Sequence, residues 1–100
     1  MSQKDFLDLY NGKKDGIVLF HHQLCTFCHK MMPAYHRAAE DSDIDFFSIE
    51  MGDAKYAMEM MKEKGHKIIG VPLIFRFSDG EITQYEGARS TKSLIDFAKE

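Results

Sequence analysis

Apolar residues gather in three short runs along the chain, and these runs together with a fourth, more polar segment predict four strands. Residues 17–22, IVLFHH, are apolar on both faces, which is typical of a buried central strand. Residues 46–51, FFSIEM, predict a second strand. Residues 71–77 and 81–87, VPLIFRF and EITQYEG, flank the turn sequence SDG and predict a β-hairpin.

Two further segments at the ends of the chain have apolar residues at helical spacing. Ser2 precedes one of them and is a suitable N-cap for a short helix that runs to Tyr10. Ser90 precedes the other and can cap a last helix. The residues that this last helix is expected to turn inward are Leu94, Ile95 and Ala98.

The two middle helices are predicted in the same way. One begins at Cys25, and Pro33 is expected to kink it because proline lacks a backbone N–H. Its predicted apolar face is Cys28, Met31, Met32, Tyr35 and Ala39. The other is expected to be capped by Asp53 and to end at Gly65. Its predicted apolar face is Ala54, Ala57, Met58 and Met61.

The order of these elements predicts the fold. The first two strands are joined by a helix and are expected to be parallel, whereas the last two form an antiparallel hairpin. We therefore expect an α/β fold with a mixed four-stranded sheet, two parallel strands plus an antiparallel hairpin, and helices on both faces. A chain of 100 residues is expected to form a single domain over residues 1–100.

Composition narrows the classes of function. The chain is 44% apolar and 29% charged, as is usual for globular proteins. Its formal charge is −3 and its basic residues are scattered, so we expect no nucleic-acid binding. No apolar run is long enough to cross a bilayer and the first residues show no apolar signal segment, so we expect no membrane association and a cytoplasmic location.

Both cysteines lie in the sequence CTFCH, residues 25–29, directly after the first predicted strand. This spacing is compatible with a dithiol that exchanges disulfides, with a haem attachment site, or with part of a metal site. A structural cross-link is a weaker interpretation, because so short a loop would stabilise the fold little.

The predicted helix places the two cysteines in different surroundings. Cys25 stands at the helix start, where unpaired N–H groups and the helix dipole favour a thiolate and lower the pKa. Cys28 lies one turn later on the apolar face, so it should be more buried and less ionised. Disulfide exchange needs an ionised attacker with a second thiol close by. We therefore expect Cys25 to be the nucleophile and Cys28 the resolving cysteine.

Several features together resemble the thioredoxin superfamily over nearly the whole chain. The C-x-x-C motif follows a buried strand, Pro33 comes five residues after Cys28, GVP introduces the third strand, DG turns the hairpin, and YEGARS leads into the last helix. CHKMMPAYHRAAE and YEGARS are most similar to the catalytic domains of protein disulfide isomerases. The resemblance implies a thioredoxin-like fold and a thiol–disulfide oxidoreductase that needs no cofactor.

The resemblance also implies roles for residues outside the motif. Val71-Pro72 is similar to the family's cis-proline dipeptide, which in relatives lies beside the dithiol and leaves the backbone free to pair with substrate; a trans proline that starts a strand is the alternative. Leu24, where relatives often carry tryptophan, is expected to contact substrate with Val71 and Pro72. Arg89 matches an arginine that can favour the ionised dithiol, and a solvated loop arginine is the alternative.

Three departures from the family pattern are expected to affect the chemistry or the fold. Leu19 stands where many relatives carry a buried acid, so we expect slower release of mixed disulfides, with the Cys28 proton passing to water or to His22. Thr26-Phe27 matches neither pair common between the family's cysteines. We expect Thr26, Phe27 and His22 to modulate the redox behaviour. The strand that precedes the first helix in thioredoxins is missing, which implies a smaller sheet.

Other functions stay open at this point. A c-type cytochrome would bind haem through Cys25, Cys28 and His29, with one of the methionines on the other side. A zinc site would use the two cysteines and either His21 or His22, but no fourth ligand is evident. A non-catalytic interaction domain would have the same fold but no redox activity. We favour a monomeric oxidoreductase that acts on protein disulfide substrates together with a reducing or oxidising partner protein.

Overall fold

The computed structural model describes all of residues 1–100 and contains four α-helices and one four-stranded sheet. The helices are α1 (Gln3–Tyr10), α2 (Thr26–Asp41), α3 (Lys55–Glu63) and α4 (Thr91–Lys99). The strands are β1 (Gly16–His21), β2 (Phe46–Glu50), β3 (Leu73–Ser78) and β4 (Glu81–Gln84). A short 3-10 helix, η1 (Met51–Asp53), connects β2 to α3. None of the α-helices has the length and apolar character needed to cross a bilayer.

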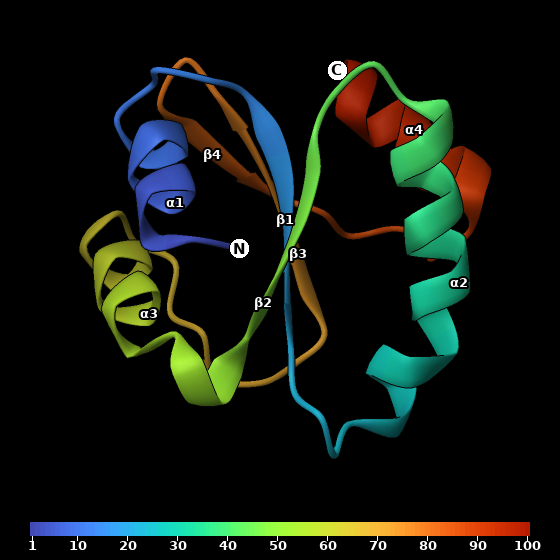
Figure 1. Cartoon of the computed structure of the whole chain (residues 1–100), viewed down its shortest axis with the longest axis horizontal. Helices are drawn as coiled ribbons and strands as arrows, with labels where there is room; N and C mark the ends of the chain where they lie inside the picture. The colour runs from blue at the N-terminus through green and yellow to red at the C-terminus, as the bar shows by residue number, and fades with distance from the viewer.

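The sheet has the strand order β2-β1-β3-β4. Strand β1 is parallel to β2 and antiparallel to β3, and β3 is antiparallel to β4. Helices α1 and α3 cover one face of the sheet, and α2 and α4 cover the other (Figure 1). The predicted α/β thioredoxin-like architecture, a mixed four-stranded sheet with helices on both faces, is therefore confirmed.

Strand β1 is buried on both faces, as its uninterrupted apolar run predicted. Successive side chains of a strand point to opposite faces. Val18 and Phe20 accordingly pack into the core beneath α1 and α3, whereas Ile17 and Leu19 pack into the core beneath α2 and α4. The central strand thus joins two apolar cores and provides a rigid base for the residues that follow it.

Local sequence signals explain most element boundaries. Ser2 and Ser90 cap α1 and α4, each accepting a hydrogen bond from the backbone N–H three residues later. Asp79 and Gly80 turn the β3–β4 hairpin with positive φ angles of 51° and 81°. Two successive residues with positive φ form the tight turn that suits the twist of a hairpin.

Two helix predictions are wrong in detail. Asp53 does not cap α3, because it lies in η1, and Ala54 occupies the N-cap position without a side-chain hydrogen bond. The Glu50 carboxylate instead accepts from the Gly52 N–H and starts the 3-10 turn earlier in the chain. In α2, the buried alanine is Ala38 and not the predicted Ala39, because the buried positions Cys28, Met31, Tyr35 and Ala38 are three or four residues apart.

Candidate active site

Two connections meet at one end of the sheet. One follows β1 into α2, and the other is the α3–β3 loop, residues 64–72. Because β1 and β3 are antiparallel, with Phe20 opposite Leu73, the end of one strand lies beside the start of the other. This arrangement brings Cys25 to the α3–β3 loop, and its Sγ lies 3.8 Å from the carbonyl oxygen of Val71.

Cys25 is the N-cap residue of α2. Its backbone N–H donates to the carbonyl of His22 at 3.0 Å, which fixes the turn before the helix. Its Sγ accepts a hydrogen bond from the N–H of Cys28 at 3.2 Å. The sulfur therefore takes the place that a serine or aspartate oxygen usually has at a helix start, where backbone N–H groups lack partners.

The same surroundings lower the pKa of the Cys25 thiol below its usual value. The largest cause is a hydrogen bond from the Cys28 side chain, and desolvation opposes it. The backbone N–H groups of Cys28 and Phe27 also lower the pKa, and the charge of Arg89 adds the smallest contribution. Each of these favourable groups stabilises the thiolate more than the thiol.

Cys28 has the opposite character. Its side chain is only 2% exposed, and burial together with the hydrogen bond that it gives to Cys25 raises its pKa to about 11. The backbone N–H of His22 and the charge of Arg89 act against this rise. Two cysteines three residues apart thus differ sharply, with one partly exposed and its pKa lowered and the other buried and its pKa raised.

The residues predicted to contact substrate lie around Cys25. The Val71–Pro72 peptide bond is cis. The N–H of Val71 makes no hydrogen bond within the chain, and its carbonyl accepts only from the Cys25 thiol. Leu24 is 82% exposed directly before Cys25. The unpaired backbone of Val71 and the exposed side chain of Leu24 therefore both lie next to the sulfur of Cys25.

Two more large apolar side chains are exposed, one between the cysteines and one in the α3–β3 loop that contacts Cys25. Phe27 is 63% exposed between the cysteines, where the ammonium of Lys30 lies 5.8 Å from its ring centre. Ile69, which the sequence prediction missed, is 84% exposed in the α3–β3 loop. Together with Leu24, these are the exposed large apolar residues of the chain, and all three lie in segments that adjoin Cys25 or the Val71 that contacts it. The sequence signal that could have pointed to Ile69 is the pair of consecutive isoleucines before Gly70. In the structure only the first of them, Ile68, is buried.

The predicted modulators are placed as follows. Thr26 begins α2 and is exposed. The Nδ1 of His22 accepts the N–H of Leu24 at 3.1 Å, so the ring holds the turn before Cys25. Arg89 is exposed, and its charge reaches both sulfurs. Leu19 is wholly buried in the core beneath α2 and α4, among apolar side chains.

The arrangement does not support a metal or haem site. No three His, Cys, Asp or Glu residues are grouped closely enough to hold a metal ion. The Nε2 of His29 lies 2.6 Å from the carbonyl of Gln23 on the exposed side of α2, whereas Cys28 is buried. His21 lies 3.7 Å from Glu50, and burial lowers its pKa in spite of that carboxylate.

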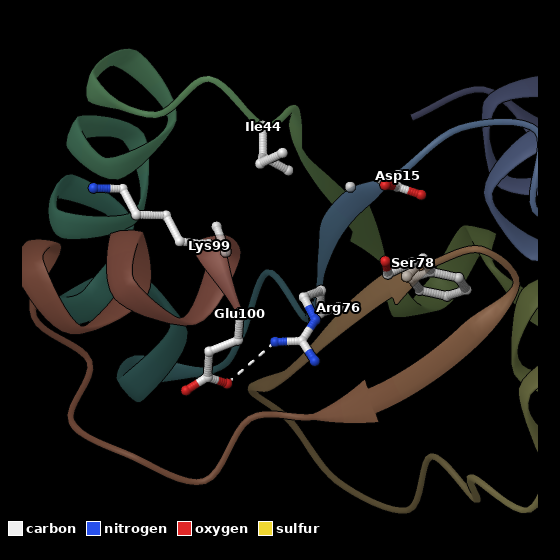
Figure 2. Close-up of a pocket in the computed structure, with 9 residues that line it drawn as sticks. Asp15, Ile44, Arg76, Ser78, Lys99 and Glu100 are labelled. Carbon is white, nitrogen blue, oxygen red and sulfur yellow. Dashed lines mark hydrogen bonds and ion pairs between the residues drawn. The ribbon is translucent and has the colours of Figure 1, made fainter.

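A cavity of about 160 Å³ lies at the opposite end of the sheet, where β1 starts and β3 ends (Figure 2). Arg76 lines it, and its Nη1 donates to the carbonyl of Phe97 at 3.0 Å and to Glu100 Oε2 at 3.1 Å. No cysteine or histidine lines this cavity. This cavity and the two sulfurs are therefore separate features of the molecule.

Comparison with known proteins places this geometry in a family. The family model described as Thioredoxin matches residues 1–100, so the chain belongs to the thioredoxin family. Protein disulfide-isomerase 1 of Caenorhabditis elegans is 26% identical over 104 residues, covering 99% of this chain and 20% of that protein. Protein disulfide-isomerase of Saccharomyces cerevisiae is 32% identical over 94 residues, covering 88% of this chain and 17% of that protein.

Solved structures show the same fold. The J-Trx1 fragment of ERdj5 matches with a TM-score of 0.81 and 25% identity over 99% of this chain and 48% of that one. The first thioredoxin domain of mouse protein disulfide-isomerase A4 matches with a TM-score of 0.77 and 18% identity over 99% of this chain and 71% of that one. The chain spans about a fifth of the length of the curated relatives, and its similarity to protein disulfide isomerases is that of a single thioredoxin domain.

Proposed function

We propose that this protein is a thiol–disulfide oxidoreductase that reduces or exchanges disulfides of other proteins. The observation that carries this proposal is the contrast between the two sulfurs: Cys25 is accessible with a lowered pKa, and Cys28 is buried with a raised pKa. An attacking thiolate with a protonated resolving thiol one turn away is the pair that disulfide exchange requires.

The reaction has two balanced steps. The Cys25 thiolate attacks one sulfur of a substrate disulfide, forming a mixed disulfide and releasing the other substrate sulfur as a thiolate. Cys28 then loses its proton and attacks Cys25 Sγ, which releases the second substrate thiolate and leaves a Cys25–Cys28 disulfide. A partner protein that supplies two electrons reduces this disulfide, or the oxidised pair passes it on to another dithiol.

The surroundings of Cys25 suit a polypeptide substrate. Ionisation of Cys25 removes the thiol hydrogen that its Sγ donates to Val71, so the carbonyl and the N–H of Val71 are both free in the reactive state. An extended substrate segment pairs with such a backbone as an added strand. Leu24 and Pro72 contact that segment on either side of the disulfide.

Removal of the Cys28 proton is the step with the least support from the surrounding residues. Leu19 offers no base, and the Nδ1 of His22 is occupied by the N–H of Leu24. Water is therefore the proposed proton acceptor, and resolution of the mixed disulfide is the slow step. The His22 backbone N–H favours the Cys28 thiolate once it forms.

The direction of the reaction, the cellular location and the oligomeric state stay predictions. The direction of exchange depends on the potential of the Cys25–Cys28 pair relative to that of its compartment. The cytoplasmic location and the monomeric state expected above stay predictions. A direct check is the redox state of the pair in cells, measured by alkylation of free thiols, because the cytoplasm keeps such pairs reduced.

The first test is reduction of insulin disulfides with dithiothreitol as the electron source. The wild type should accelerate the reaction, and Cys25→Ser should abolish the acceleration. Thr26→Ser is a matched control, because it makes an equally small change on the exposed start of α2. If the wild type has no activity and no thiol that titrates reversibly, the chain is an interaction domain that keeps the fold without the chemistry.

A further inference from the structure

We propose that a basic groove beside the α3–β3 loop selects substrates with acidic residues close to the disulfide cysteine. This proposal rests on the proposed function and names the class of polypeptide that the dithiol acts on. The groove has a volume of about 230 Å³ and lies between one face of α3 and the start of the α3–β3 loop. Its lining residues are Lys55, Met58, Glu59, Lys62, Lys67 and Ile68.

The charge of the groove differs from that of the molecule. Three lysines and one glutamate line it, a net charge of +2, whereas the whole chain has a formal charge of −3. None of these four side chains forms an ion pair or a hydrogen bond within the chain. The three ammonium groups therefore face solvent without a carboxylate partner, on a molecule that otherwise repels anions.

The floor of the groove is apolar, which favours a polypeptide over a small anion. Met58 is partly buried against the core beneath α1 and α3, and Ile68 belongs to that core. Next along the loop, Ile69 exposes 84% of its side chain. A Cβ placed on Gly70 would meet no atom within 4 Å, so the loop has no cover there. An apolar surface with a basic rim complements a segment that carries both apolar and acidic side chains.

The groove lies within reach of the reactive sulfur. Val71, at the end of the loop, has its carbonyl 3.8 Å from Cys25 Sγ. Lys67 is four residues before Val71, a span of at most about 14 Å along the chain. A substrate segment that extends from its disulfide across Ile69 therefore brings side chains about four residues from its cysteine to the lysines. Selection would act on residues that flank the disulfide, and the sulfur chemistry would not change.

The test compares two peptides that are identical except for charge. Each is a disulfide-linked dimer with one cysteine per chain and a leucine between that cysteine and three glutamates, and its twin carries glutamines there. Reduced protein in excess converts the dimer to two peptide thiols and itself to the Cys25–Cys28 disulfide, so no other reductant is needed. Chromatography of the peptide thiols gives a second-order rate constant for each peptide.

The wild type should reduce the acidic peptide about fivefold faster than its neutral twin, and the preference should shrink at about 1 M salt. The double variant K62E/K67E should lose or reverse the preference, measured as the ratio of the two rate constants, because it replaces two of the groove's ammonium groups with carboxylates. The control K13E/K99E makes the same change in net charge at exposed lysines outside the groove and should keep the preference. Circular dichroism melting confirms that each variant is folded.

Each contrary result has a distinct meaning. Equal rates for both peptides in the wild type would overturn the groove's role and leave the oxidoreductase function intact. Loss of the preference in both double variants would show that the net charge of the protein, and not the groove, sets the preference. That result would also overturn the groove's role. No reduction of either peptide would overturn the proposed function and this proposal together. Binding of a short oligonucleotide that K62E/K67E abolishes, with equal peptide rates, would assign the groove to nucleic acid instead.

Discussion

At the cavity end of the sheet, the Nη1 of Arg76 donates to the Phe97 carbonyl and to Glu100, and the Asp15 carboxylate accepts the N–H of Asp79. At the dithiol end, backbone N–H groups point toward a sulfur that ionises, and the N–H of Val71 has no partner. The charged groups of the first end are therefore paired within the fold, whereas the second end keeps an unpaired backbone N–H beside a sulfur whose pKa is lowered. The cavity at the first end holds neither cysteine, so the backbone N–H groups around one sulfur are a better guide to function here than that cavity.

Leu19 lies in the core between the two ends, and replacing it should give the largest change in stability. Leu19→Asp should lower the free energy of unfolding by about 4 kcal/mol, because it removes apolar burial and places a carboxyl among apolar side chains. If the missing acid limits resolution, the folded variant should also release mixed disulfides faster. Urea unfolding and single-turnover reduction measure the two effects.

The matched control is Leu19→Asn, which places a polar group at the same site without an acid. It should lower stability to a similar extent and leave the rate of mixed-disulfide release unchanged. Equal release rates for the wild type and both variants would show that the leucine does not slow release of the mixed disulfide.

The two sulfurs should differ by at least about a hundredfold in reactivity at pH 7. The thiolate is the form that reacts with iodoacetamide; the pKa of Cys25 lies below the usual value, and that of Cys28 is raised to about 11. As the pH rises, labelling of Cys25 should level off first, while labelling of Cys28 continues to increase toward pH 11. Peptide mapping by mass spectrometry follows each cysteine, and a single shared pH profile would contradict the assigned roles.

Arg76→Met should have a smaller effect, confined to the cavity end. Loss of the hydrogen bonds from Nη1 to Phe97 and Glu100 should lower the free energy of unfolding by about 1 kcal/mol, because Arg76 Nε is buried without a partner and its removal offsets part of the loss. Insulin reduction should not change. Glu100→Gln, which affects only an exposed pair, should cost less than about 0.5 kcal/mol. A clear fall in activity for Arg76→Met would show that the two ends are coupled.

The sequence was informative where a local pattern has one physical solution. The two-sided apolar run of β1 needs a buried central strand, and positive φ at Asp79 and Gly80 suits the residues found in that turn. The cap of α3 was not predictable, because aspartate is a favourable N-cap residue and nothing in the local pattern argues against Asp53. In the structure the Glu50 carboxylate caps η1 instead, and Asp53 becomes part of that 3-10 turn.

The candidate site shows the same division. The position of Cys25 at a predicted helix start was enough to predict a lowered pKa for its thiol. The unpaired N–H groups that favour the thiolate belong to the backbone of every helix and need no tertiary contact. The exposure of Ile69 and the basic groove beside it depend on how the α3–β3 loop lies against α3, which involves contacts distant from the C-x-x-C motif in sequence. Tertiary packing, rather than a local pattern, decides which of two adjacent isoleucines is buried.

Trapping of the mixed disulfide is the most direct test of the central claim that Cys25 attacks and Cys28 resolves. The reduced variants Cys28→Ser and Cys25→Ser would each be mixed with oxidised insulin and examined by mass spectrometry without reductant. Cys28→Ser should accumulate a covalent adduct through Cys25, because nothing remains to release it, and Cys25→Ser should form almost none. Equal adducts in both variants, or an adduct only through Cys28, would contradict the assignment.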